Sequence, residues 1–257
     1  MLKTSNILQG FIALLLVSCC LAVQAEQIHI AAASNLRHVM PKLAELFEQQ
    51  TGNHLMISYA ASGTITSQIQ YGAPFDVFMS AKREYIDKLN KAGLTQGEVQ
   101  HYANAQLVLF LPHHSTLNVE QGLAGIQIAL DNETLTKVAM ANPRHAPYGQ
   151  IAQQVLEEAG LWSSIQAHLL LAENASQAVQ FTLSSSVDAG FIPLSYAIQP
   201  QLQSAGDFIV LKGQLPQYSV MIKGAPAAAK QFMAFMQTSL AGELLEQQGF
   251  IVKGIYP

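Results

Sequence analysis

The chain has 257 residues, of which 50% are hydrophobic and only 12% are charged, and its formal net charge is −4. So few charges exclude a nucleic-acid binder that relies on a basic surface, and they exclude a highly charged disordered chain. The length and hydrophobic content permit one large domain or two lobes of about 100 to 120 residues each. Both cysteines, Cys19 and Cys20, lie near the N-terminus, so the remaining chain can build neither a zinc cluster nor a disulfide framework.

Residues 1–25 have the pattern of a secretory signal peptide. A short polar stretch with Lys3 leads into an apolar run from Ile7 to Val23, and the segment ends at the small residue Ala25. We expect cleavage after Ala25 and export to the periplasm of a bacterial cell envelope. The segment Leu16 to Cys19 also resembles a lipoprotein processing box, which leaves lipid anchoring at Cys19 as the less favoured alternative.

Strand-like runs and helical patterns alternate along the rest of the chain, which is typical of α/β folds with mostly parallel sheets. We expect strands at residues 28–32, 54–59, 75–80, 107–111, 137–141, 169–171, 189–193, 208–211 and 220–223. We expect helices around residues 43–47 and at 64–71, 82–91, 151–159, 175–183, 227–237 and 240–248. Pro41 lacks an N–H and clashes with a preceding helical turn, so the first helix should begin near Arg37 to Met40.

Common catalytic and nucleotide-binding motifs do not occur in the sequence. It contains no G-x-G-x-x-G, no G-x-x-x-x-G-K-[ST], no H-E-x-x-H and no G-x-S-x-G. His113 and His114 follow a proline on a predicted loop, and neighbours in sequence do not face one ligand together. The acidic residues are scattered and are best interpreted as solvated helix faces.

Small polar residues stand at four junctions where a predicted strand leads into a predicted helix. The four junctions are Ser34-Asn35, Ser62-Gly63-Thr64, Pro147-Tyr148-Gly149 and Asn174-Ala175-Ser176. In an α/β sheet such junctions lie at the carboxyl edge, where ligands bind. Four helix starts aimed at one point would offer free N–H groups and helix dipoles to an anion. Ordinary helix capping is the alternative at each junction, because Ser and Asn are preferred N-caps.

Five sequence blocks at and near these junctions resemble the periplasmic molybdate-binding proteins of molybdate ABC importers. The blocks are Ala31 to Asn35, Ala60 to Gly63, Gly72 to Phe78, Ala141 to Pro143 with Ala146 to Gly149, and Glu173-Asn174. The match extends over essentially the whole chain after the signal peptide. The likeness is greatest to the branch with Ser-Asn at the first junction and Pro-Tyr-Gly at the later one.

The resemblance implies the two-lobed fold of type II periplasmic binding proteins. Each lobe would be a mostly parallel sheet flanked by helices, and two crossing strands would form the hinge. We expect these crossings near Ala105 to Leu111 and near Tyr218 to Lys223. Lobe 1 would then comprise residues 26–106 and 220–257, and lobe 2 would comprise residues 107–219.

The same resemblance implies the site. Ser34 and Asn35 stand at the first ligand contact, Ser62 at the second, and Tyr148 where a backbone amide and a tyrosine are offered. Ala175 stands where a larger aliphatic residue usually donates its amide, so the pocket wall could be looser here. Another branch uses a tyrosine in the strand after Gly190, but Pro193 occupies that region, so no contact is expected from it.

The expected function is capture of molybdate and tungstate in the cleft and delivery to the permease and ATPase subunits of an ABC importer. We expect a monomer without cofactor, catalytic residues or nucleic-acid partner. Both anions are fully deprotonated at neutral pH, so a pocket of donors alone suits them and disfavours protonated phosphate. The alternatives are a binding protein for sulfate or an organic acid, and a hydrolase that uses Ser34 or Ser62 with His38 as base. The preference between molybdate and tungstate, the affinity and the identity of the importer stay open.

Overall fold

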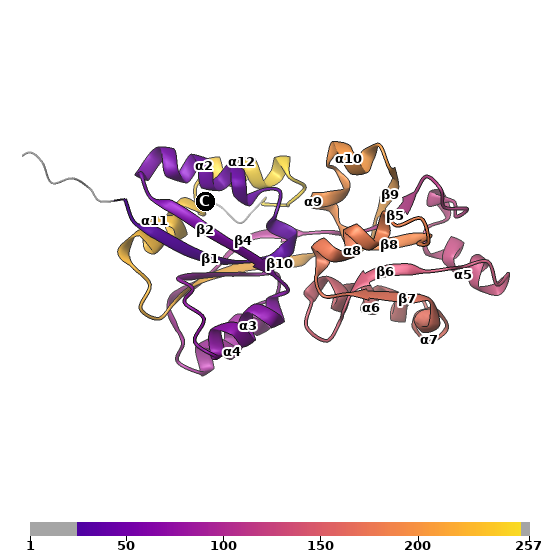
Figure 1. The fold of residues 1–257 in the computed structure, drawn as a ribbon, viewed down its shortest axis with the longest axis horizontal. Coiled ribbons are helices and arrows are strands. Elements are labelled where there is room, and N and C mark those ends of the chain that lie inside the picture. The colour runs from indigo at the N-terminus through magenta and orange to yellow at the C-terminus, as the bar shows by residue number, and fades with distance from the viewer. Residues whose placement is uncertain (1–24, 253–257) are drawn as a thin grey trace, which may run out of the picture.

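The computed structural model describes residues 25–252, and the predicted signal peptide up to residue 24, with Cys19, lies outside the described residues. Figure 1 shows two lobes side by side, each built on a five-stranded sheet with helices on both faces. Within the described range, no helix is both long enough and apolar enough to span a membrane.

In lobe 1 the strand order is β2-β1-β3-β10-β4. Strand β1 pairs in parallel with β2 and β3, and β10 is antiparallel to both of its neighbours. Four strands therefore run one way and only β10 runs the other. The strands are β1 Gln27–Ala33, β2 His54–Ala60, β3 Val77–Ser80, β4 Thr95–Ala105 and β10 Leu215–Ile222. The helices are η1 Ser34–Leu36, α2 Met40–Thr51, α3 Ser62–Gln70, α4 Arg83–Lys91, α11 Ala227–Phe235 and α12 Ser239–Gln247.

Lobe 2 repeats this plan with the order β7-β6-β8-β5-β9, in which β6 is parallel to β7 and β8 while β5 is antiparallel to β8 and β9. The strands are β5 Leu107–Pro112, β6 Val138–Ala141, β7 Leu169–Ala172, β8 Ala189–Pro193 and β9 Gly206–Val210. The helices are η2 Val119–Gln121, α5 Leu123–Asp131, α6 Pro147–Glu158, α7 Trp162–Ile165, η3 Gln166–His168, α8 Ala175–Thr182, α9 Leu194–Ala197 and α10 Pro200–Gln203. The expected α/β architecture with mostly parallel sheets is confirmed.

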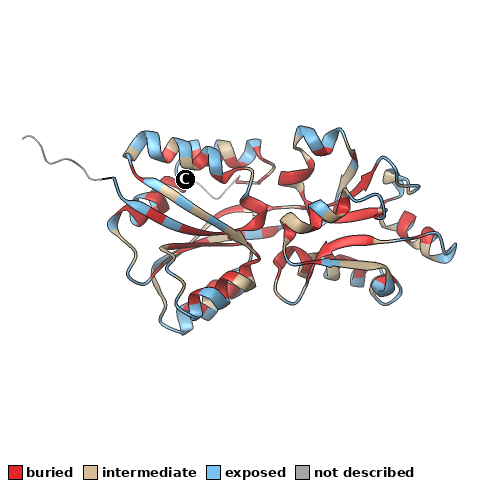
Figure 2. Ribbon diagram, viewed as in Figure 1, coloured by how far each residue is buried: buried red, intermediate tan, exposed pale blue. Residues whose placement is uncertain are grey.

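Helical spacing of apolar residues explains how the helices cover the sheets. In α2, Leu43 and Phe47 are four residues apart and fully buried, and Gly52 ends the helix in the left-handed region at φ 74°. Phe47 packs edge-on against Phe232 of α11, with ring centroids 5.5 Å apart. Helices α3 and α4 cover the opposite face, and Figure 2 shows the buried residues running along the strands and the inner sides of the helices.

The chain crosses between the lobes twice. The first crossing is at Gln106, between β4 and β5, and the second is at residues 211–214, between β9 and β10. The sequence placed the second crossing at Tyr218 to Lys223 and gave residues up to 219 to lobe 2, but Leu215 already pairs with Ala105 in the lobe 1 sheet. Gln217 and Ser219 are fully buried polar residues that interrupt the apolar pattern, so only the apolar end of β10 was recognised as a strand.

Candidate functional site

A small pocket lies between the lobes, at the carboxyl ends of strands β1, β2, β3, β6 and β7. The empty space within it, including the part open to solvent, is about 200 Å³. The lining residues are Ala33, Ser34, Asn35, Ala60, Ala61, Ser62, Ala81, Ala146, Pro147, Tyr148 and Ala175. All five residues that the sequence selected, Ser34, Asn35, Ser62, Tyr148 and Ala175, therefore meet at one place. Their role as ligand contacts stays a prediction.

Three of the four helix starts at this pocket have no side-chain cap. The N-cap residues of η1, α3 and α6 are Ala33, Ala61 and Ala146, none of which can cap with its side chain. Only Asn174 caps its helix, by accepting a hydrogen bond from the Gln177 amide at 3.1 Å. Capping therefore does not explain the serines at positions 34 and 62. Alanine is a poor N-cap, so the first-turn N–H groups are left for another acceptor.

Several of these backbone donors face the pocket without a partner. No acceptor within the described residues takes the N–H groups of Asn35, Ser62, Tyr148 or Ala175. Each belongs to the first turn of its helix, where the macrodipole is positive in the longer helices α3, α6 and α8. The pocket is thus a convergence of donors from both lobes.

The two serine hydroxyls are oriented to donate as well. The Ser62 Oγ accepts a hydrogen bond from the Ala81 amide at 3.1 Å, and the Ser34 Oγ accepts one from the Ser176 amide at 3.4 Å. An oxygen that accepts from a backbone N–H keeps its own hydrogen for another partner. Both serines are buried, so the pocket is the place where that hydrogen can be used.

Asn35 and Tyr148 both line the pocket, and the Asn35 Oδ1 and the Tyr148 hydroxyl are buried without a hydrogen-bond partner among the described residues. The Asn35 Nδ2 donates to Gln217 Oε1 at 3.0 Å, and Gln217 Nε2 donates to the Leu215 carbonyl at 2.8 Å, which fixes the orientation of both amides. Burial raises the pKa of the Tyr148 hydroxyl well above its ordinary value, and the Asn35 side chain lowers it only in part. Tyr148 is therefore neutral and keeps a hydrogen to donate.

The pocket lining is neutral at physiological pH. No Asp, Glu, Lys, Arg or His side chain belongs to it. A site made of donors without carboxylate acceptors binds anions that carry no proton of their own. Among residues 25–252, no group of three or more His, Cys, Asp or Glu side chains could hold a metal ion.

A hydrolase arrangement is not formed in the described residues. His38 packs edge-on against Tyr196 with ring centroids 4.4 Å apart, and no hydrogen bond joins it to Ser34 or Ser62 within the described part of the chain. Burial, followed by the charges of Arg37 and Lys42, lowers the pKa of His38.

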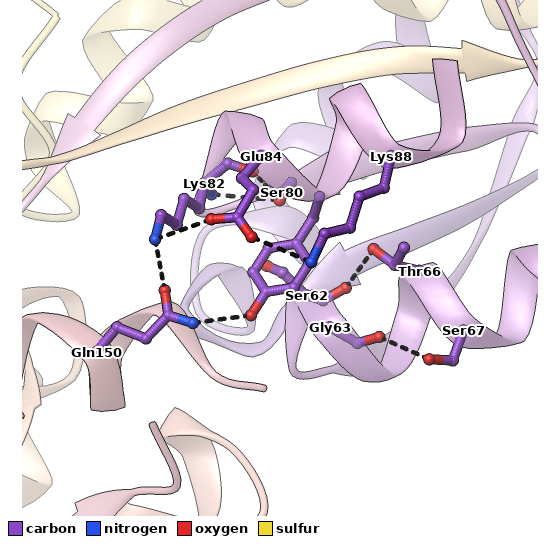
Figure 3. A network of polar contacts seen from close by, with 10 residues as sticks. Ser62, Gly63, Thr66, Ser67, Ser80, Lys82, Glu84, Lys88 and Gln150 are labelled. Carbon is purple, nitrogen blue, oxygen red and sulfur yellow. Dashed lines mark hydrogen bonds and ion pairs between the residues drawn. The ribbon is translucent and has the colours of Figure 1, made fainter. Parts of the chain in front are cut away.

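The lobes touch on both sides of the pocket, so the structure is a closed form. We define the Tyr196 contact region as Ser34, Asn35 and Arg37 of lobe 1 with Ser176, Ser195 and Tyr196 of lobe 2. We define the Gln150 contact region as Gly63, Lys82 and Tyr85 of lobe 1 with His145 and Gln150 of lobe 2. In the second region, Gln150 joins Lys82 at 2.8 Å and Tyr85 at 3.0 Å, and the Gly63 amide donates to the His145 carbonyl at 2.9 Å. Figure 3 shows Gln150 reaching across to Lys82, which also contacts Glu84.

Sequence reasoning singled out Ser176 but missed Ser195 and Tyr196, the other two lobe 2 residues of the Tyr196 contact region. The Ser195 Oγ donates to the Asn35 carbonyl at 2.9 Å, and the Tyr196 hydroxyl donates to the Ser34 carbonyl at 2.9 Å. Both residues lie in the short helix α9, which begins at Leu194 directly after strand β8 ends at Pro193. The same strand-to-helix rule that selected the other junctions could have found them. Pro193 itself does not line the pocket.

Comparisons with known proteins agree on one family, the extracellular solute-binding proteins of bacteria. A family model described as bacterial extracellular solute-binding protein matches residues 28–251. The molybdate-binding protein ModA of Azotobacter vinelandii is 30% identical over 242 residues, which cover 91% of this chain and 93% of that protein. The solved periplasmic molybdate-binding protein of Azotobacter vinelandii has a TM-score of 0.78 at 29% identity, covering 87% of this chain and 98% of that one. The sulfate-binding protein SubI of Mycobacterium tuberculosis H37Rv shares the fold, with a TM-score of 0.71 at 14% identity, covering 89% of this chain and 88% of that one.

Proposed function

Because the chain belongs to the family of bacterial extracellular solute-binding proteins, we propose that it captures molybdate in the pocket between its lobes. It then delivers the anion to the permease and ATPase subunits of an ABC importer from the periplasmic side. Tungstate, an anion of the same shape and charge, is a ligand of the same pocket. The relatives described above support this proposal by their names and by their coverage of nearly the whole chain.

The observation that carries the proposal is a pocket lining rich in hydrogen-bond donors and without a carboxylate. Uncapped helix starts and two serine hydroxyls converge there from both lobes, and no carboxylate competes with the ligand. If about six charge-assisted hydrogen bonds contribute roughly 1.5 kcal/mol each, the gross sum is about 9 kcal/mol. Before ordering costs, that corresponds to a Kd of about micromolar or better.

Proton content and size together set the selectivity. Hydrogen phosphate carries a proton that needs an acceptor, and the lining offers no carboxylate to take it. Sulfate is fully deprotonated but smaller, so donors fixed on helix starts cannot all close around it. Ala175 stands where relatives usually have a larger aliphatic residue. Its backbone amide is still available as a donor, and only part of the pocket wall is lost with the smaller side chain.

A thermal-shift series with molybdate, tungstate, sulfate and phosphate at equal concentration tests the proposal. A ligand that binds only the native state raises Tm by mass action, so molybdate and tungstate should raise Tm while sulfate and phosphate do little. Equal shifts for sulfate and molybdate would overturn the size argument. A shift with sulfate alone would make this a sulfate-binding protein.

We also propose that the chain is a monomer that acts by binding and not by catalysis. Because the donors are divided between the lobes, the anion enters an open form that closes about residues 106 and 211–214. Small-angle scattering should show a smaller radius of gyration with molybdate than without it, at the mass of one chain. Turnover of model esters that is lost in Ser34→Ala or Ser62→Ala would revive the hydrolase alternative.

A further inference from the structure

A chain of hydrogen bonds leads from a cation on the surface to the pocket, and it crosses between the lobes on the way. Arg37 Nε donates to Ser176 Oγ at 3.2 Å, and Ser176 Oγ lies 2.7 Å from the Tyr196 hydroxyl. The Tyr196 hydroxyl donates to the Ser34 carbonyl at 2.9 Å. Arg37 and Ser34 belong to lobe 1, whereas Ser176 and Tyr196 belong to lobe 2, so the chain is complete only when the lobes are closed.

The direction of every hydrogen in this chain is fixed. The Ser34 carbonyl can only accept, so the single hydrogen of the Tyr196 hydroxyl is committed to it. The Ser176 hydroxyl must therefore donate to Tyr196, and its oxygen accepts from Arg37. Tyr196 is buried, and burial raises its pKa more than Ser176 and Arg37 lower it. The tyrosine thus keeps the hydrogen that the chain requires.

The chain ends on a peptide group that faces the pocket. The carbonyl of Ser34 and the N–H of Asn35 belong to the same amide, and that N–H has no acceptor in the described part of the chain. A hydrogen bond accepted by the oxygen of an amide polarises it and strengthens the donor on its nitrogen. A positive charge at the far end of such a chain of hydrogen bonds polarises the amide further and also strengthens the N–H donor.

Arg37 is suited to this role because its charge is not neutralised by a carboxylate. It forms no ion pair with any carboxylate of residues 25–252, and its guanidinium is held 4.5 Å from the centroid of the Tyr59 ring. It does not line the pocket. The hydrogen-bond path from the guanidinium to the Ser34–Asn35 peptide therefore runs through the side chains of Ser176 and Tyr196.

We propose that Arg37, Ser176 and Tyr196 form an interlobe relay that polarises the Ser34–Asn35 peptide and strengthens its N–H as a donor to the bound oxyanion. The relay rests on the proposed function. It couples closure to affinity, because the hydrogen-bond path from the Arg37 guanidinium to the Ser34 carbonyl runs through Ser176 and Tyr196 of lobe 2. The three residues are positioning residues, since none of them touches the ligand.

A double-mutant cycle on the affinity for molybdate, measured by calorimetry, tests the relay. Tyr196→Phe keeps the ring against His38 and removes the hydroxyl, and it should weaken binding about 10-fold. Arg37→Gln should weaken binding about 3-fold in the parent and have no effect in the Tyr196→Phe background. The loss of affinity from Arg37→Gln should persist at high salt, because the relay acts through hydrogen bonds. A loss caused by the long-range electrostatic field of Arg37 would instead be screened by salt. Unchanged Tm values without ligand show that each variant folds.

Arg83→Gln is the matched control. Arg83 also lies over a tyrosine ring, at 5.8 Å from the centroid of Tyr218, but it pairs with Asp87 and is outside the chain of hydrogen bonds. The affinity of the Arg83→Gln variant for molybdate should equal that of the parent. Equal losses from Arg37→Gln in both backgrounds, or no loss in either, would overturn the relay alone. Absence of oxyanion binding by the parent would overturn the proposed function and the relay with it.

Discussion

On one side of the pocket the lobes join through the backbone carbonyls of residues that line it, and on the other they join through residues that do not line it. In the Tyr196 contact region, the carbonyls of Ser34 and Asn35 accept hydrogen bonds from lobe 2. In the Gln150 contact region, the Gln150 side chain joins Lys82 and Tyr85, and none of these three lines the pocket. The first region can therefore change the strength of the ligand donors, whereas the second can only hold the lobes together.

The cations of the two regions differ in the same sense. Lys82 has a carboxylate partner, Glu84, at 3.2 Å, which it shares with Lys88. Arg37 has no such partner among the described carboxylates. A cation beside the pocket is therefore expected to strengthen anion binding only if it has no carboxylate partner and is linked to the pocket by hydrogen bonds.

The largest loss of affinity is expected from Ser62→Asp, because the new carboxylate would occupy the pocket that lies between the two contact regions. Ser62 is fully buried at the first residue of α3. A carboxylate there would take the free N–H groups as a resident anion and repel the ligand. Calorimetry should detect no molybdate binding. Ser67→Asp, on the exposed side of the same helix, is the control and should bind like the parent. If Ser62→Asp still binds as tightly as the parent, the site is misplaced.

Gly63→Ala should break the Gln150 contact region by steric clash. An added Cβ would lie 2.7 Å from the His145 carbonyl oxygen and 3.0 Å from its Cα, both in the opposite lobe. Overpacking of this kind costs about 1 to 3 kcal/mol, or roughly 5-fold to 150-fold in affinity.

The same change should stabilise the ligand-free protein, since alanine favours a helix by roughly 0.5 to 1 kcal/mol over glycine. Weaker molybdate binding together with a higher Tm of the free protein is the expected pair of results. Gly125→Ala, in helix α5 away from the interface, is the control for the helix effect. Unchanged affinity in Gly63→Ala would mean that the bound form is more open than this structure.

Ser195→Ala should break one backbone contact of the Tyr196 contact region. Its hydroxyl donates to the Asn35 carbonyl at 2.9 Å and is buried. The loss of such a bond costs about 0.5 to 1.5 kcal/mol, or roughly 2-fold to 12-fold in affinity. Stopped-flow release of molybdate should be faster, with little change in the rate of binding. A slower association with unchanged release would contradict a role in holding the closed form.

Gln150→Ala should have a smaller effect, because its contacts are partly exposed and do not involve the ligand donors. Polar contacts near solvent contribute about 0 to 1 kcal/mol, so we expect affinity to fall by about 2-fold or less. The comparison between the two regions fails if Gln150→Ala weakens molybdate binding more than Ser195→Ala does.

No effect is expected from pH between 7 and 9. Each region contains a buried tyrosine, Tyr196 or Tyr85, whose pKa is raised chiefly by burial. A raised pKa means that the folded chain holds the proton more tightly, so this stabilisation is complete below pH 10 and declines as the pH rises further. Affinity for molybdate should be constant from pH 7 to 9, and Tm should begin to fall above pH 10. A steady loss of affinity between pH 7 and 9 would reveal a titrating group in the site.

The junctions that meet at the pocket were predictable from local chemistry, whereas the choice of the five site residues came from the family resemblance. Ser34, Ser62, Tyr148 and Ala175 each follow an apolar strand and begin a helix, and parallel strands bring their carboxyl ends to one edge. What the sequence did not show is that the serines are not caps. That distinction depends on the alanines before them and on Ala81 and Ser176, which occupy the hydroxyl oxygens from distant elements.

The second crossing and the residues Ser195 and Tyr196 of the Tyr196 contact region were not predicted, whereas the first crossing was expected where the structure has it. Strand β10 contains Gln217, a buried amide that bonds with Asn35 across 182 positions of the chain, and no local pattern indicates such a pair. Strand β4 is mostly polar in sequence and is placed by its pairing with β10. Ser195 and Tyr196 had the signal of a strand end, but their partners are carbonyl groups, which carry no sequence information.

The most direct measurement is anomalous diffraction from crystals grown with molybdate, recorded above the molybdenum absorption edge. The account predicts a single molybdenum peak per chain in the pocket, surrounded by Ser34, Asn35, Ser62, Tyr148 and Ala175, with no cation in contact with the anion. A peak at any other place, or an anion held directly by Arg37 or Lys82, would contradict it.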